Sequence, residues 1–167
     1  MCKLEKNEHI NIDILATSDM HSHFMNGDFG SNIYRAGTYV KNIRENNDKV
    51  ILLDSGGSVA GSLAAHYYAI VAPYKRHPMI KLMNAMQYDA SGISPDDFKF
   101  GLSFLTKAVS LSRFQYIIKE YDNVRIAIVG LTADGLMKNE FAEMEKEVSI
   151  EKALLSAKRW ILSLIHI

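Results

Sequence analysis

Residues 10–24 read INIDILATSDMHSHF, and this segment indicates the class of the fold. Its first eight residues alternate and then run apolar, which is typical of a strand that enters a buried sheet. The residues after Thr17 are polar and lead into a glycine-containing stretch, which is typical of a loop. A buried strand that ends in a polar loop is where α/β proteins usually carry their chemistry.

The rest of the chain alternates helical and extended patterns. The predicted elements are a strand at 10–17, a helix at 32–46, a strand at 49–54, a helix at 59–70, a helix at 78–87, a short strand at 88–93, a helix at 98–112, a hairpin from the runs 115–120 and 124–130, and mostly helix from Leu136 onward. This alternation predicts an α/β fold with a largely parallel sheet. The loops after Thr17, Leu53 and Ile93 then leave the same edge of the sheet.

The composition limits the classes of function. The 167 residues are 48% apolar and 23% charged, which is ordinary for one globular domain. Lys+Arg and Asp+Glu both total 19, and a formal net charge of zero argues against a nucleic-acid partner. Cys2 is the only cysteine, so neither a disulfide within the chain nor a thiolate zinc site is expected. We find no apolar core typical of a signal peptide and no apolar run of membrane-spanning length, and therefore expect a cytoplasmic protein without a membrane partner.

Asp19 and His21 directly follow the first predicted strand, and His23 lies two residues further on. A carboxylate and an imidazole separated by one residue can both point at one ion, and this mixed set suits Mn, Fe or Zn. The same pair is also common in surface loops that bind nothing, so both interpretations stay open here. His23 is expected to hydrogen-bond within the loop rather than to bind an ion.

Several motifs fall in one order along residues 12–134. They are ILATSDMHSHF at 14–24, VILLDSG at 50–56, Gly61-Ser62, MNAMQYDA at 83–90, FKFG at 98–101 and VRIAIVGL at 124–131. Together they resemble the opening motifs of calcineurin-like metallophosphoesterases of the 5′-nucleotidase and 2′,3′-cyclic-nucleotide phosphodiesterase type. The resemblance implies the N-terminal half of a β-sandwich flanked by helices, in a family that hydrolyses nucleotide phosphoesters with two divalent metals.

The family motifs are incomplete in this sequence. Asp19 and His21 match the metal-binding Asp and His of the first motif, but Gly57 stands where the family has the Asp that bridges the two metals. Pro95 stands where an Asn binds metal, and Asp96 stands where a catalytic His acts on the leaving group. Glycine and proline side chains have no donor atom, and an ionised aspartate is a poor acid. The later histidine motifs do not occur in the sequence.

Two cations a few ångströms apart repel strongly without an anion between them. We therefore expect at most one divalent ion (Mn, Zn, Fe or Mg), held by Asp19 and His21 with Asp97 as a candidate third ligand. We assign no catalytic residue, and Asp96 only marks the position of the family histidine. The preferred interpretation of Asp96 and Asp97 is an exposed helix N-cap.

Three further features have two interpretations each. Asp54 either supports the site or simply hydrogen-bonds the turn after it, and we prefer the turn. The SGGS turn at 55–58 could cradle a phosphate, but it lacks the pattern and the lysine of a phosphate-binding loop. The segments Tyr67-Tyr68 and 74–77 (YKRH) form either a cationic rim for a phosphate or a solvated helix end, and we prefer the helix end.

The last six residues, LSLIHI at 162–167, resemble the translation of a sequencing adapter. We therefore divide the chain into a partial metallophosphoesterase-like domain at 1–161 and a non-native tail at 162–167. Three functions stay open: an impaired phosphohydrolase, a non-catalytic module that binds a nucleotide, a phosphoester or a protein partner, and a fragment without independent function. Exposed sheet in part of a domain also predicts self-association.

Overall fold

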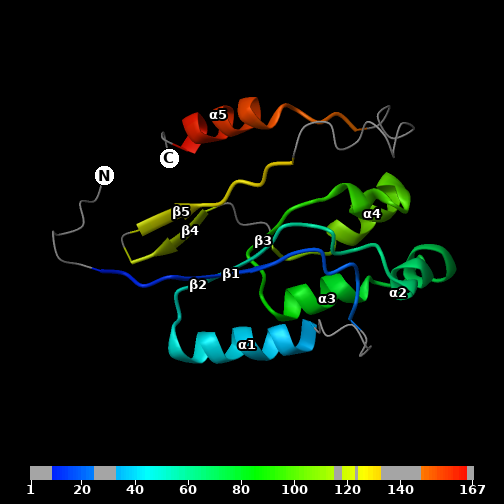
Figure 1. Ribbon diagram of the computed structural model, residues 1–167, viewed down its shortest axis with the longest axis horizontal. Helices are drawn as coiled ribbons and strands as arrows, with labels where there is room; N and C mark the ends of the chain where they lie inside the picture. The colour runs from blue at the N-terminus through cyan, green and yellow to red at the C-terminus, as the bar shows by residue number, and fades with distance from the viewer. Residues whose placement is uncertain (1–8, 25–32, 115–117, 123, 133–147, 165–167) are drawn as a thin grey trace.

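The computed structural model describes residues 9–24, 33–114, 118–122, 124–132 and 148–164. The elements in chain order are β1 (Asp13–Thr17), α1 (Ile33–Asn46), β2 (Val50–Asp54), α2 (Leu63–His66), the π-helix η1 (Tyr67–Val71), α3 (Pro78–Ala85), β3 (Ala90–Ser91), the 3-10 helix η2 (Pro95–Phe98), α4 (Gly101–Val109), β4 (Ile118–Tyr121), β5 (Val124–Ala127) and α5 (Ala153–Leu164). Strands β1, β2 and β3 form a parallel sheet in that order, and β4 and β5 pair as an antiparallel hairpin. Figure 1 shows α1 and α3 on one side of the parallel sheet, and the hairpin and α5 on the other. The predicted α/β fold with a largely parallel sheet is confirmed.

Several boundaries differ from the prediction. The helix expected at 59–70 begins only at Leu63, because Ser62 caps it by accepting a hydrogen bond from the Ala65 N–H at 3.0 Å. The helix expected at 98–112 is shortened to α4, and Phe98 instead ends η2. The strand expected at 88–93 is reduced to β3. Residues 115–117 and 133–147 lie outside the described part, so the C-terminal helical prediction is confirmed only for α5.

Strand β2 is the centre of the core. Val50, Ile51 and Leu52 are at most 2% exposed, and burial of each such side chain contributes about 1.5–3 kcal/mol. Helices α1 and α3 cover one face of β2 with a shared apolar cluster. Arg44 of α1 also donates hydrogen bonds to the carbonyls of Met86 and Gln87 at the end of α3, which joins the two helices.

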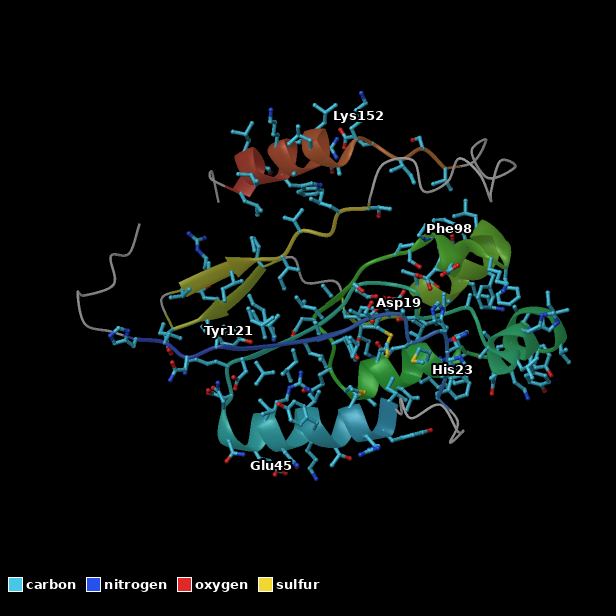
Figure 2. All side chains as sticks on the ribbon, in the orientation of Figure 1. Asp19, His23, Glu45, Phe98, Tyr121 and Lys152 are labelled. Atoms are coloured by element: carbon cyan, nitrogen blue, oxygen red, sulfur yellow. The ribbon has the colours of Figure 1, made fainter. Side chains whose placement is uncertain are left out.

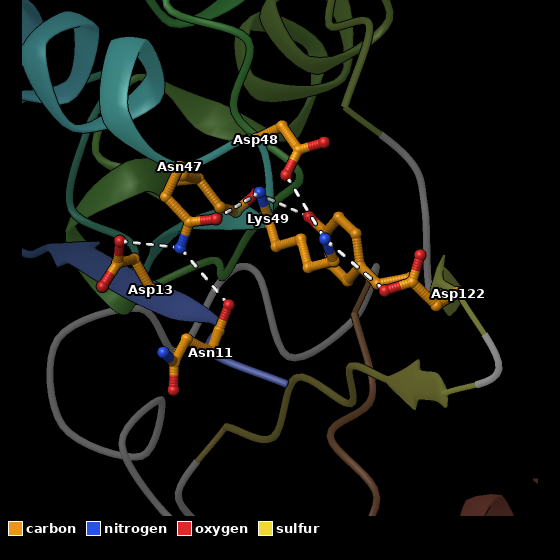
Figure 3. Close-up of polar contacts among 8 residues, drawn as sticks. Asn11, Asp13, Asn47, Asp48, Lys49 and Asp122 are labelled. Carbon is orange, nitrogen blue, oxygen red and sulfur yellow. Dashed lines mark hydrogen bonds and ion pairs between the residues drawn. The ribbon is translucent and has the colours of Figure 1, made fainter. Parts of the chain in front are cut away.

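Figure 3 shows the polar contacts where β1 and β2 begin. The Asn47 side chain donates to the Asn11 carbonyl at 3.3 Å and to the Asp13 carboxylate at 3.0 Å. Its own carbonyl accepts the Lys49 N–H at 3.0 Å. The Asn47 side chain, which directly follows α1, therefore fixes where β1 and β2 begin. This end of the sheet is opposite the loops that follow β1, β2 and β3.

The uncovered part of the β2 edge is closed by side chains. Strand β3 pairs only with Leu53 and Asp54, so the earlier edge groups of β2 have no strand partner. The Asp89 carboxylate accepts the Leu52 N–H at 2.8 Å and forms an ion pair with Lys119 at 2.6 Å. Lys119 and the Tyr121 hydroxyl both donate to the Val50 carbonyl. These contacts satisfy the edge and attach the hairpin to the parallel sheet.

One face of β1 is exposed to solvent. Ile14 is 63% exposed, whereas the sequence predicted a strand that runs into a buried sheet. Exposure of this kind is what motivated the prediction of self-association, and that prediction stays untested.

His77 is not part of a cationic rim. It is 3% exposed and lies between the rings of Tyr68 and Phe104, with ring centroids 6.1 and 5.7 Å away. Burial lowers the pKa of His77 from 6.5 to about 4, against smaller opposing effects of the Val59 backbone and the Asp97 charge. His77 is therefore a neutral core residue at neutral pH. Both the rim interpretation and the preferred interpretation of a solvated helix end are wrong for this position.

Substitution of Asp89 tests the closure of the β2 edge. Asp89→Ala is expected to lower the free energy of unfolding by about 2–4 kcal/mol, because Lys119 and the Leu52 N–H both lose their partner. Asp89→Asn keeps an acceptor for the N–H and is expected to lose roughly half as much. Urea unfolding monitored by circular dichroism measures both. Asp48→Ala is the control, since Asp48 pairs with Lys49 at the surface with 89% exposure. Equal losses in all three variants would contradict this account.

Acid unfolding tests the burial of His77. The unfolded imidazole takes up a proton near its ordinary pKa of 6.5, but the folded one does so only near 4. The unfolded state thus binds more protons in this window, and His77 is expected to cost roughly 3 kcal/mol of stability as the pH falls through it. His77→Phe removes this contribution, so its stability relative to wild type should rise as the pH falls. A difference that does not change with pH would show that His77 is not protonated on unfolding.

Candidate functional site

Asp54 joins the ends of the three parallel strands. Its carboxylate accepts hydrogen bonds from Thr17 of β1 at 2.8 Å, from the Gly56 N–H at 3.0 Å, from Ser58 at 2.8 Å and from Ser91 of β3 at 3.1 Å. Asp54 is 5% exposed, and burial raises its pKa while these hydrogen bonds lower it. The predicted bond between Asp54 and the following turn is confirmed. The same carboxylate also positions the loops after β1 and β3.

The loops after β1 and β2 are bonded through their backbones. The Asp19 N–H donates to the Gly56 carbonyl at 3.0 Å, and the His21 N–H donates to the Gly57 carbonyl at 2.7 Å. The Ser22 hydroxyl donates to the Ser58 carbonyl at 2.8 Å. These bonds place Asp19 and His21, the two predicted metal ligands, beside the turn that carries Gly57.

Three residues of the first loop have left-handed backbone conformations. The φ angles are 50° at Asp19, 46° at His21 and 58° at Ser22. Residues other than glycine rarely adopt this region, and such outliers gather at functional sites. In this conformation the side chains of Asp19 and His21 lie against the loop that follows β2.

Gly57 lies against the Asp19 side chain. A Cβ atom at this position would stand 2.8 Å from the Asp19 Oδ1 atom and 3.5 Å from the Ser94 hydroxyl oxygen. Position 57 thus faces the Asp19 carboxylate directly but presents only a hydrogen atom to it. Gly61 makes a similar close approach, since a Cβ there would stand 2.8 Å from Nδ1 of His21.

Asp97 is bonded to the backbone. Its carboxylate accepts the N–H groups of Gly57 at 2.8 Å, Val59 at 2.9 Å and Ser94 at 3.0 Å. The prediction of a helix start here is confirmed, but the N-cap of η2 is Ser94, and Asp97 is the N3 residue whose carboxylate accepts the Ser94 N–H in a capping box. The prediction that this cap is exposed is wrong, because Asp97 is 3% exposed. Tertiary contacts with the second loop cover it.

The other predicted positions lie at the same end of the sheet. Pro95 begins η2, and Asp96 is exposed on it. Figure 2 shows Asp19 and His23 at this end, far from Tyr121. A cavity of about 280 Å³ opens beside Asp19, with Thr17, Ser18 and His23 on its polar side and Met20 and Ile33 among its apolar lining.

The described residues do not form a two-metal centre. In that part of the chain, no group of three or more His, Cys, Asp or Glu side chains is arranged to hold an ion. Asp54, Asp89 and Asp97 are each committed to hydrogen bonds or an ion pair within the fold. Asp19 of the first loop is exposed and accepts a hydrogen bond from the Ser18 hydroxyl, and His21 of the same loop is half-buried.

The sequence did not predict the hydroxyl groups that surround Asp54. Thr17 ends β1, Ser58 lies in the turn after β2 and Ser91 ends β3, and nothing in their spacing links them. The available signal was that each lies at or just beyond the end of a predicted strand, where parallel strands bring residues together.

The sequence was compared with known protein families and with individual proteins. No family model matches the chain. The trifunctional nucleotide phosphoesterase protein YfkN of Bacillus subtilis is 24% identical over 91% of this chain. A 2′,3′-cyclic-nucleotide 2′-phosphodiesterase/3′-nucleotidase of Yersinia enterocolitica is 22% identical over 91% of it. The chain spans only 13% and 29% of the length of these two relatives.

Solved structures show the same fold. The crystal structure of calcineurin-like phosphoesterase YfkN matches 93% of this chain with a TM-score of 0.81 and 23% identity, over 58% of its own length. A putative 5′-nucleotidase from Staphylococcus aureus matches 93% of this chain with a TM-score of 0.79 and 17% identity, over 35% of its own length. The sequence relatives and fold neighbours of this chain are therefore calcineurin-like phosphoesterases of the 5′-nucleotidase and 2′,3′-cyclic-nucleotide phosphodiesterase types, as the motifs predicted.

Proposed function

We propose that this protein is a metallophosphoesterase-family member that does not hydrolyse phosphoesters and instead binds a nucleotide or a related phosphoester at the ends of β1, β2 and β3. The observation that carries the proposal is Gly57. Two-metal hydrolysis needs two cations about 3.5–4 Å apart that clamp the phosphate. Their mutual repulsion requires an anion between them, and position 57 supplies none.

We propose that no side chain among the described residues replaces the missing bridge. Asp97 is the nearby candidate, with its Oδ2 atom 2.8 Å from the Gly57 nitrogen. Its two oxygens accept three backbone N–H groups, so binding a metal would leave buried donors without acceptors, each at a cost of about 1–3 kcal/mol. We therefore propose that Asp97 holds the second loop in place rather than an ion.

Asp19 and His21 keep part of the family's ligand set. Two protein ligands hold a divalent ion weakly, because most protein sites use more. We propose at most one ion at this pair. The cavity beside Asp19 has the mixed polar and apolar lining of a small-molecule site. The relatives of this chain include a nucleotide phosphoesterase, YfkN, so a nucleotide is the first ligand to test.

Turnover measurements test the loss of hydrolysis. With manganese present, hydrolysis of 5′-AMP and 2′,3′-cyclic AMP by the wild type is expected to equal that of Asp19→Ala. Glu45→Ala controls for loss of a carboxylate on α1, where Glu45 forms an exposed pair with Lys41. Calorimetric titration of manganese should give no more than one weak site, which Asp19→Ala abolishes. Turnover that depends on Asp19 would refute the proposal.

Nucleotide binding is measured with the same proteins. Equilibrium dialysis with 5′-AMP is expected to show binding by the wild type and by Glu45→Ala. An absence of binding with and without manganese would refute the binding role and leave the chain without independent function. Gly57→Asp is not expected to restore turnover, because its Cβ would stand 2.8 Å from Asp19 Oδ1 in a strained backbone.

Asp97→Asn tests whether this residue holds the second loop. The amide side chain has one acceptor oxygen for three N–H groups, so the variant is expected to unfold more easily by about 2–4 kcal/mol. Hydrogen exchange at Gly57 and Val59 should become faster. Asp96→Asn is the matched control on the exposed side of η2 and should change neither quantity. Unchanged exchange at both amides in Asp97→Asn would contradict the role.

A further inference from the structure

The segment formed by α2 and η1 (residues 63–71) leaves three large aliphatic side chains exposed, while alanines and Tyr68 form its inward side. Ala65 within it and Ala72 just after it are 0% and 1% exposed and face the core. Leu63, Ile70 and Val71 are 91%, 60% and 61% exposed. A surface helix normally turns its large apolar side chains inward. Here they face solvent, and grouped apolar exposure of this kind marks an interaction surface.

Two tyrosines extend this surface. Tyr67 is 41% exposed and Tyr74 is 75% exposed. We call the group the apolar ridge; its members are Leu63, Tyr67, Ile70, Val71 and Tyr74. The Lys75 ammonium lies 5.7 Å from the Tyr67 ring centroid and 6.0 Å from that of Tyr74. The ridge therefore has a cation held against its aromatic members.

The chain segment that carries the ridge has charges of one sign. Residues 55–88 contain Lys75, Arg76 and Lys81 but no aspartate or glutamate. Lys107 of α4 reaches the same region, where its ammonium donates to the Pro73 carbonyl. A chain with zero formal net charge thus has a locally basic region at its exposed apolar surface. An anionic surface would be attracted to it.

The ridge is firmly attached and accessible. Ser62 caps α2 and donates a hydrogen bond to the Ser22 carbonyl of the first loop at 3.0 Å. Figure 1 shows α2 at one extremity of the long axis of the molecule. A short helix at an extremity can meet a flat surface without interference from the rest of the fold.

We propose that the apolar ridge and its basic flank dock this protein on the surface of an anionic lipid bilayer. Aliphatic side chains enter the boundary between headgroups and acyl chains, and tyrosines prefer the headgroup level. Lys75 and Arg76 then meet the anionic headgroups. The contact is peripheral, since the described residues include no helix long and apolar enough to cross a membrane. The proposal is independent of the nucleotide-binding role, because no ridge residue belongs to that site.

Vesicle sedimentation with the full chain tests the proposal. The wild type is expected to bind equimolar phosphatidylglycerol–phosphatidylcholine vesicles at low salt and to bind pure phosphatidylcholine roughly tenfold more weakly. Ile70→Ser/Val71→Ser should weaken binding roughly tenfold or more. Lys75→Gln/Arg76→Gln should remove the preference for anionic vesicles. Tyr39→Ser is the matched control, because Tyr39 is 59% exposed on α1, and it should bind as the wild type does.

A fluorescent reporter shows which side chains meet the lipid. Tyr67→Trp in a Trp160→Phe background carries a single indole on the ridge, and brominated lipids should quench it. Circular dichroism confirms that each variant is folded. The proposal is overturned if the wild type does not bind anionic vesicles, if the indole is not quenched, or if the ridge variants bind as the wild type does. It is also overturned if sedimentation velocity shows a dimer that Ile70→Ser/Val71→Ser abolishes, because the ridge is then a protein interface.

Discussion

The site depends on one buried carboxylate, Asp54, which holds three loops together. Each of its hydrogen-bond donors comes from a segment at the end of a different strand or from the turn that follows Asp54 itself. An unpartnered buried carboxylate is very costly, so these donors must converge for the chain to fold. The arrangement of the loops is thus a consequence of folding and does not require a bound metal.

Backbone groups occupy the positions where side-chain chemistry is expected. Gly57 brings its N–H to Asp97 and its carbonyl to the His21 N–H, so both of its backbone groups are bonded. The Asp97 carboxylate likewise accepts N–H groups from the loop after β2 and from the N-cap of η2. Hydrogen bonds within the fold therefore maintain the shape of this edge, and they join Gly57, His21 and Asp97.

The sequence predicted the elements that local pattern determines. Strands β1 and β2 and helix α1 follow from apolar periodicity, and the place of the site follows from where those strands end. The burial of His77 and Asp97 could not be predicted, because both lie beside polar or charged neighbours and are covered by segments distant in sequence. The late start of α2 had a local signal in Ser62, a capping residue that the apolar pattern outweighed. The role of Lys119 depends on the short length of β3, which only the folded sheet reveals.

The left-handed residues of the first loop have a conformation that is typical of functional sites, and contacts within the fold also hold it. Backbone strain at Asp19, His21 and Ser22 is the kind of feature that points to a working site. In this chain, however, each strained residue is held by a bond to the second loop: Asp19 to the Gly56 carbonyl, His21 to the Gly57 carbonyl and Ser22 to the Ser58 carbonyl. Those bonds are sufficient to maintain the conformation. The shape of this loop therefore does not depend on the side chains of Asp19 and His21, because the backbone N–H groups of these two residues make the bonds that hold them.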